Sequence, residues 1–195
     1  MLHETGSGAG APPRAMVAMV RAIDGLAIWS GRIFCWLVVP LVAALTYEVF
    51  ARYVFHAPTI WAYDVAYMLY GTHFMLGAAY TLYRGGHIRT DLFYQNWSVR
   101  TRGRIDAALY LLLFFPGIAL FFWMGLQEAL HAWDIREVSD ASPWRPILYP
   151  FKAVIPLALL LLMIQGISEF LKSAYAALAG RELVSGHGLP AGGEV

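Results

Sequence analysis

Four long apolar stretches constrain this chain more than any other feature of its sequence. The segments at about 33–54, 61–83, 105–127 and 151–171 each supply roughly the 20 residues of helix that a bilayer core requires. The third is the clearest, because residues 107–126 carry no charge and offer no polar face at any period. We therefore predict an all-α integral membrane protein with four transmembrane helices and amphipathic interfacial segments.

The composition excludes the other broad classes. Hydrophobic residues make up 59% of the 195 residues and charged residues 14%, whereas soluble domains average about 45–50% and about 25%. A formal net charge of +1 gives no indication of nucleic-acid binding, and we expect none. Because no Walker loop, nucleophile elbow, metal-ligand spacing or dinucleotide fingerprint occurs, we expect no enzyme activity, no metal and no cofactor.

The two ends of the chain differ from its middle. Residues 1–13 are rich in Gly, Ala and Pro and lack an apolar core, so we expect a disordered lead rather than a cleavable signal peptide. Residues 14–180 form the predicted membrane domain, and residues 181–195 are expected to be a flexible tail. Two interpretations of residues 14–30 stay open: a helix lying at the membrane surface, or an extension of the first span into the cytoplasm.

The distribution of basic residues predicts the orientation. The segment before the first span, the loop after the second and the tail hold ten of the 14 Lys and Arg residues. Short basic loops resist translocation, so both termini are predicted to face the cytoplasm.

Three charged residues lie within about two turns of predicted helix ends. Glu48 and Arg52 are four residues apart and share a helix face, where they can pair. Asp64, one turn into the second span, can join them across the hairpin. We interpret the three as a structural polar cluster or partner contact near the outer interface. The alternative is an autonomous small proton-coupled exporter, in which Glu48 or Asp64 lies deep in the bundle and binds protons.

His73 is the ionisable residue nearest the middle of the membrane. We expect its imidazole to hydrogen-bond a neighbouring backbone or hydroxyl group. A haem-bearing electron-transfer subunit is the other alternative, but it requires a second histidine at matched depth. His56, His87 and His131 all lie near span ends, which disfavours this function.

Two loops carry further motifs. After the second span comes a run of glycines and charges that suits a segment at the inner interface, namely Gly85, Gly86, His87, Arg89 and Asp91. On the opposite side, Trp144 and Arg145 lie among three prolines, which favours a fixed extended or re-entrant loop.

The order and spacing of these motifs resemble the DctQ-type small membrane subunit of tripartite ATP-independent periplasmic (TRAP) transporters. The similarity extends over about residues 23–178. It rests on the run from Glu48 to Phe55, on Pro58, Trp61 and Asp64, on the run from Gly77 to Tyr80, and on the run from Gly85 to Asp91. One departure is Asp64, where the family often has Glu.

The resemblance implies a division of labour among three proteins. A periplasmic substrate-binding protein captures the solute, a large permease carries it by a sodium-driven elevator movement, and the small subunit supports the immobile part of that permease. This chain is then expected to be a multi-pass protein of the bacterial inner membrane that contacts the large permease, the binding protein and lipid. Its system would take up an organic acid, and Trp144 and Arg145 are candidates for docking the binding protein. The resemblance assigns no residue of this chain to substrate binding or catalysis.

Overall fold

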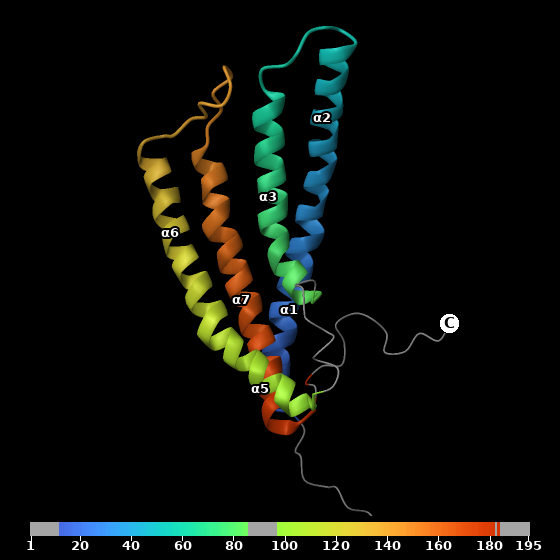
Figure 1. The fold of residues 1–195 in the computed structure, drawn as a ribbon, viewed down its shortest axis with the longest axis vertical. Coiled ribbons are helices and arrows are strands. Elements are labelled where there is room, and N and C mark those ends of the chain that lie inside the picture. The colour runs from blue at the N-terminus through green and yellow to red at the C-terminus, as the bar shows by residue number, and fades with distance from the viewer. Residues whose placement is uncertain (1–11, 86–96, 182, 184–195) are drawn as a thin grey trace, which may run out of the picture.

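The computed structural model describes residues 12–85, 97–181 and 183, and these residues are almost entirely helical (Figure 1). Helix α1 (Arg14–Phe34) passes through a 3₁₀ turn, η1 (Cys35–Leu37), into α2 (Val38–Tyr53), and α3 (Ala62–Tyr83) returns alongside α2. Helix α5 (Val99–Leu109) continues through a π-helical segment, η2 (Tyr110–Phe114), into α6 (Phe115–Asp134), and α7 (Tyr149–Ala179) returns alongside α6. The predicted all-α class is confirmed for the described residues, whereas the predicted disordered lead and flexible tail fall almost entirely outside them.

Three helical segments are long and apolar enough to cross a membrane: Arg14–Tyr53, Val99–Asp134 and Tyr149–Ala179. The prediction of four such spans is therefore wrong, and the segment that fails is the one at 61–83. Helix α3 has 22 residues, about 33 Å at 1.5 Å per residue, so its length is sufficient. Its composition is not, because it carries Asp64, His73 and five tyrosines.

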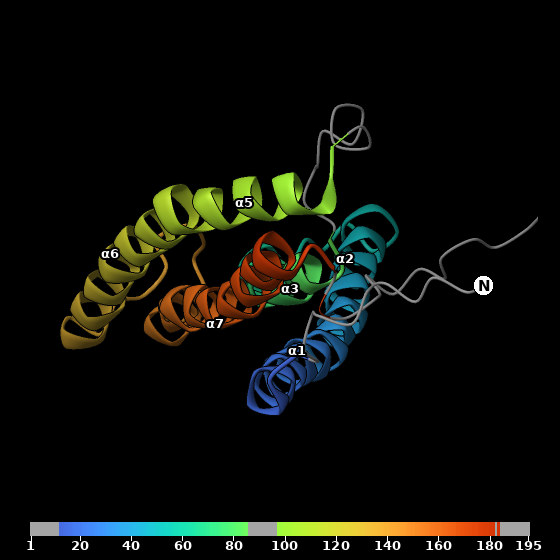
Figure 2. The same ribbon diagram turned by 90° about the horizontal axis from the view of Figure 1, so that it is seen from below.

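Helix α7 is the central element of the bundle. It contacts α1, α3, α5 and α6, and Figure 2 shows these helices arranged around it. Small residues make the close approach of these helices possible. Lipid tails are as apolar as leucine side chains, so membrane helices associate mainly through close van der Waals packing. A Cβ atom on Gly103 of α5 would lie 2.5 Å from the backbone nitrogen of Ala177, and Gly166 of α7 lies directly against the Phe114 ring. The buried apolar residues are mainly alanines: Ala27, Ala44, Ala51, Ala62, Ala79, Ala129, Ala132 and Ala158.

Two of the three intrahelical prolines follow departures from regular α-helix. The 3₁₀ turn at 35–37 precedes Pro40, and the π-helical segment at 110–114 precedes Pro116. Both changes fit the loss of a backbone donor at proline. Pro156, by contrast, lies inside α7 without interrupting it. The chain from residue 14 to residue 53 is thus one helical run, in which residues 14–30 are continuous with the first apolar segment.

His73 reinforces the chain where α1 passes into α2. Its Nδ1 atom lies 2.9 Å from the carbonyl oxygen of Phe34, the last residue of α1. A carbonyl oxygen only accepts hydrogen bonds, so the ring donates from Nδ1. The expectation that His73 bonds a backbone group is confirmed.

The close contact of α5 with α7 predicts the effect of one added methyl group. Gly103→Ala places Cβ against backbone atoms of α7 that cannot rotate away, so the free energy of unfolding should fall by about 1–3 kcal/mol. Gly77→Ala in α3 is the matched control, because its Cβ meets nothing within 4 Å; this variant should gain up to about 1 kcal/mol from helix propensity. Unfolding of the purified protein in detergent measures both, and identical unfolding curves for the two variants would contradict this packing.

Candidate functional site

Buried polar side chains gather in two places in the described structure. One is the α1–α7 cluster, formed by Asp24, Gln165, Ser168, Glu169 and Lys172. The other lies at the far end of the bundle, where Asp64 at the start of α3 meets the loop between α6 and α7. Polar groups at membrane depth are costly unless they are paired, so these are the first places to look for function.

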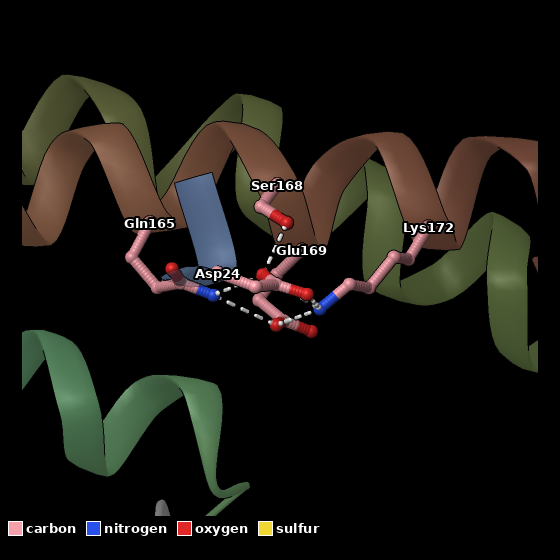
Figure 3. Close-up of polar contacts among 5 residues, drawn as sticks. All are labelled: Asp24, Gln165, Ser168, Glu169 and Lys172. Atoms are coloured by element: carbon pink, nitrogen blue, oxygen red, sulfur yellow. Dashed lines mark hydrogen bonds and ion pairs between the residues drawn. The ribbon is translucent and has the colours of Figure 1, made fainter. Parts of the chain in front are cut away.

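The α1–α7 cluster is centred on one carboxylate (Figure 3). Asp24 of α1 accepts hydrogen bonds from Ser168 Oγ at 2.7 Å and Gln165 Nε2 at 3.0 Å. Lys172 Nζ lies 2.9 Å from Asp24 Oδ2 and 2.8 Å from Glu169 Oε1. The four α7 residues are spaced at i, i+3, i+4 and i+7, which places them on one helix face. That face is the one turned toward α1.

The charges of this cluster do not cancel. Two carboxylates share one ammonium group, and the Glu169 side chain is only 4% exposed. Neutral donors from Ser168 and Gln165 supply the remaining stabilisation, as a buried ion pair requires. Lys172 Nζ also lies 5.5 Å from the centre of the Tyr83 ring of α3, within the range of a cation–π contact. One cluster therefore ties together α1, α3 and α7.

Sequence reasoning did not find the α1–α7 cluster. Asp24 lies within the segment 14–30, and Lys172 comes directly after the last predicted span at 151–171. The spacing of Gln165, Ser168 and Glu169 within an apolar helix was a usable signal. Their partner was not predictable, because Asp24 and Lys172 are 148 residues apart in the sequence.

At the other end of the bundle, the structure pairs Glu48 with Arg52. Arg52 Nε lies 2.9 Å from Glu48 Oε1, and the second carboxylate oxygen of Glu48 accepts a 2.9 Å hydrogen bond from the backbone N–H of Thr59. The Thr59 hydroxyl also donates to this oxygen. The pair thus fixes the turn that leads from α2 to α3.

Asp64 does not join Glu48 and Arg52 as the sequence suggested. It is 1% exposed and accepts hydrogen bonds from Ser139 Oγ at 2.7 Å and from Ser142 Oγ. The reason is geometric: the first turn of α3 directs this carboxylate toward the α6–α7 loop, while Thr59 occupies the free oxygen of Glu48. The predicted single cluster is therefore two separate contacts.

The loop from 135 to 148 is held firmly on the bundle. Besides the serine contacts to Asp64, an isolated antiparallel β-bridge joins Val138 to Ile147. Lys152 at the start of α7 lies 2.7 Å from Glu128 and 2.6 Å from Glu137. The docking candidates Trp144 and Arg145 are both exposed, and Arg145 has a positive φ of 47° and an ion pair with Asp140 at 2.8 Å.

The predicted inner-interface motif falls mostly outside the described residues. Gly85 is described, with a φ of 67° that favours glycine, and its N–H donates to the carbonyl oxygen of Leu82 at 3.0 Å. Gly86, His87, Arg89 and Asp91 lie outside the described residues.

The contacts at both ends of the bundle join helices to each other rather than enclose a ligand. Within residues 12–85, 97–181 and 183, no group of three His, Cys, Asp or Glu side chains is arranged to hold a metal ion. Each buried carboxylate is engaged by hydrogen-bond donors of the same chain. These hydrogen bonds and ion pairs are structural contacts that hold α1, α3, α7 and the α6–α7 loop together.

Comparison with known proteins identifies the family to which such a bundle corresponds. The family model described as tripartite ATP-independent periplasmic transporters, DctQ component, matches residues 41–175. This range includes Glu48, Arg52 and Asp64, and all of the α1–α7 cluster except Asp24. A comparison with curated proteins gives no match.

The α1–α7 cluster predicts that removing the Lys172 cation lowers the free energy of unfolding more than removing the Arg145 cation. Lys172→Met leaves two buried carboxylates without a counter-ion, so the free energy of unfolding should fall by about 3 kcal/mol. Arg145→Ala is the control, because its ion pair with Asp140 is exposed and should contribute little. Unfolding in detergent measures both changes, and equal stability of the two variants would show that the cluster does not hold α1 in place.

The contacts of Asp64 predict a second, local effect. Ser139→Ala combined with Ser142→Ala removes both hydroxyl donors from this carboxylate and should release residues 135–148. Amide hydrogen exchange in this loop should become about tenfold faster, the equivalent of about 1.4 kcal/mol. Ser98→Ala, an exposed helix cap on α5, is the control and should leave the exchange of this loop unchanged.

Proposed function

Because the chain belongs to the DctQ family, the small permease component of tripartite ATP-independent periplasmic transporters, we propose that it is a scaffold for the large permease of its system. In this role it enlarges the immobile part of that permease, against which the transporting part moves. The family match over residues 41–175 is the observation that carries the proposal.

The packing of the bundle supports a role that does not include translocation. The buried polar side chains of the described residues are Asp64 with Ser139, the α7 residues Gln165, Ser168 and Glu169, and Ser30, which bonds its own helix backbone. The buried apolar side chains of the helices are eight alanines together with Val20, Leu76 and Leu82. A hydrophilic solute requires a continuous polar path, whereas the buried polar side chains of the described residues form separate groups, and Ser30 bonds only its own helix. A static support for another subunit fits this core.

We propose that the end of the bundle where α1 begins and α7 ends faces the cytoplasm. Figure 1 shows these two ends close together, at the same end of the molecule. Arg14, Arg21, Arg100, Arg102 and Arg104 belong to α1 and α5 at this end. Basic residues are retained on the cytoplasmic side of membrane proteins, which supports this orientation.

The opposite end would then face the periplasm and help to seat the substrate-binding protein. The loop from 135 to 148 is fixed by Asp64 and Lys152, and it exposes Trp144 and Arg145. A rigid surface with an exposed aromatic ring and a cation is suited to docking a protein. The resemblance noted above further implies sodium-driven uptake of an organic acid, with the solute and ion sites on the other chains.

The two alternative functions receive no support. An exporter requires Glu48 or Asp64 free in the interior, whereas both carboxylates are engaged by donors of this chain. A haem subunit requires facing histidines, whereas His73 bonds the Phe34 carbonyl.

The scaffold proposal predicts a stable complex. When this chain is co-expressed with the large permease of its own system and extracted in mild detergent, the two should co-purify through size-exclusion chromatography at a fixed ratio. Recovery of this chain alone under conditions where both are folded would overturn the proposal.

The position of the Glu48–Arg52 pair predicts that its loss affects assembly of the complex and not the affinity for solute. Arg52→Ala frees the turn before α3, so it should lower the yield of the complex several-fold and leave the affinity for solute unchanged. Arg21→Ala, exposed on α1, is the control. Normal yield of the complex with altered solute affinity would place this pair in solute recognition instead.

A further inference from the structure

An apolar groove runs along the surface of the bundle between α2 and α3. Its lining consists of Leu41 and Leu45 from α2 and Tyr63, Ala66, Tyr67 and Tyr70 from α3. The three tyrosines are spaced at i, i+4 and i+7, so they form a stripe on one helix face. Each is more than half exposed, and Phe74 continues the stripe by one more turn.

The hydroxyl groups of this tyrosine stripe have no partner in the described part of the chain. The rings of Tyr67 and Tyr70 contact Phe151 and Phe74, but these contacts do not involve the hydroxyls. No hydrogen bond of Tyr63, Tyr67 or Tyr70 is formed among the described residues. Lipid tails offer no acceptor, so an unpaired hydroxyl in the hydrocarbon region is unfavourable.

Position at the membrane interface explains only the start of the stripe. Aromatic residues with a polar edge are stable at headgroup depth, which accounts for Tyr63 and for the stacked pair Tyr47 and Trp61. Tyr70 lies eight residues after the start of α3, about 12 Å along its axis, and is 59% exposed. Where α3 crosses the hydrocarbon region, the acceptor for this hydroxyl must come from a protein.

The exposed face of α6 shows what a lipid contact looks like in the same chain. Leu112 and Leu113 at the π-helical segment, followed by Leu120, Phe121 and Met124, are all at least 60% exposed and carry no hydrogen-bonding group. These five side chains require no hydrogen-bond acceptor, and the indole of Trp123, three residues after Leu120, is 59% exposed beside them. The contrast also explains why α3 is less apolar than the other long helices: its tyrosines are suited to a protein surface.

We propose that the groove between α2 and α3 seats one transmembrane helix of the large permease, whose carbonyl or hydroxyl oxygens accept hydrogen bonds from Tyr63, Tyr67 and Tyr70. The occupant is a helix because an apolar groove between two helices at membrane depth fits a third one, and only a protein supplies acceptors there. Ala66 leaves room at the centre of the lining for close approach. This inference rests on the proposed scaffold function and specifies the face that carries it.

Site-specific photo-crosslinking in the assembled complex tests whether the groove between α2 and α3 contacts the large permease. Benzoylphenylalanine is introduced at Tyr67 or Tyr70, and at Phe121 on α6 as a matched exposed aromatic control. Irradiation should produce an adduct with the mass of the large permease from positions 67 and 70, and none from position 121. If the complex co-purifies but the adduct forms only from position 121, or positions 67 and 70 react only with lipid or a second copy, the groove is not the interface. If no complex forms, the scaffold function fails first.

Removal of the hydroxyls tests the hydrogen bonds separately. Tyr67→Phe and Tyr70→Phe keep the rings, and each should speed dissociation of the complex about threefold, the usual effect of one hydrogen bond between membrane helices. Tyr149→Phe is the control, because its ring packs edge-on against Trp133 and does not line this groove. Unchanged dissociation for the stripe variants would overturn the proposed hydrogen bonds, even where the crosslinks form.

Discussion

A hydrocarbon environment gives a polar side chain no hydrogen-bond partner, and this constraint determines how the helices of this chain are joined. Asp24 is bound by three donors from α7, and Asp64 by two serines of the α6–α7 loop. The Asp64 contacts lie where α3 begins, whereas the Asp24 contacts start at Gln165 near the middle of α7, and the buried apolar residues are mainly alanines. The rest of the architecture follows, with α7 at the centre and each neighbouring helix packed against it.

A bundle fastened at both ends is suited to remain still while another protein moves. The carboxylates of Asp24, Asp64 and Glu169 all accept hydrogen bonds from donors of this chain. The surface of the bundle also differs between α6 and the groove between α2 and α3. Leu120, Phe121 and Met124 of α6 expose only apolar groups, whereas the groove between α2 and α3 is lined by tyrosines whose hydroxyls have no partner among the described residues. A small permease component of a larger transporter requires this combination of a fixed interior and one polar-edged apolar face.

Hydropathy predicted much of this fold and little of its polar connections. The helix expected at 61–83 is observed as Ala62–Tyr83, and the first apolar segment ends at Tyr53. The segments expected at 105–127 and 151–171 extend to Val99–Asp134 and Tyr149–Ala179, because their polar ends remain helical where hydropathy falls. The pairing of Glu48 with Arg52 followed from a four-residue spacing. The partners of Asp24 and Asp64 did not, since contacts across 148 and 75 residues leave no local pattern.

Uptake into liposomes tests the central claim most directly. Three preparations are compared, containing this chain alone, the large permease alone, or both, each with a sodium gradient and the system's binding protein loaded with its radiolabelled solute. The account predicts uptake only when both membrane subunits are present. Uptake by this chain alone, or full uptake by the large permease without it, would contradict the account.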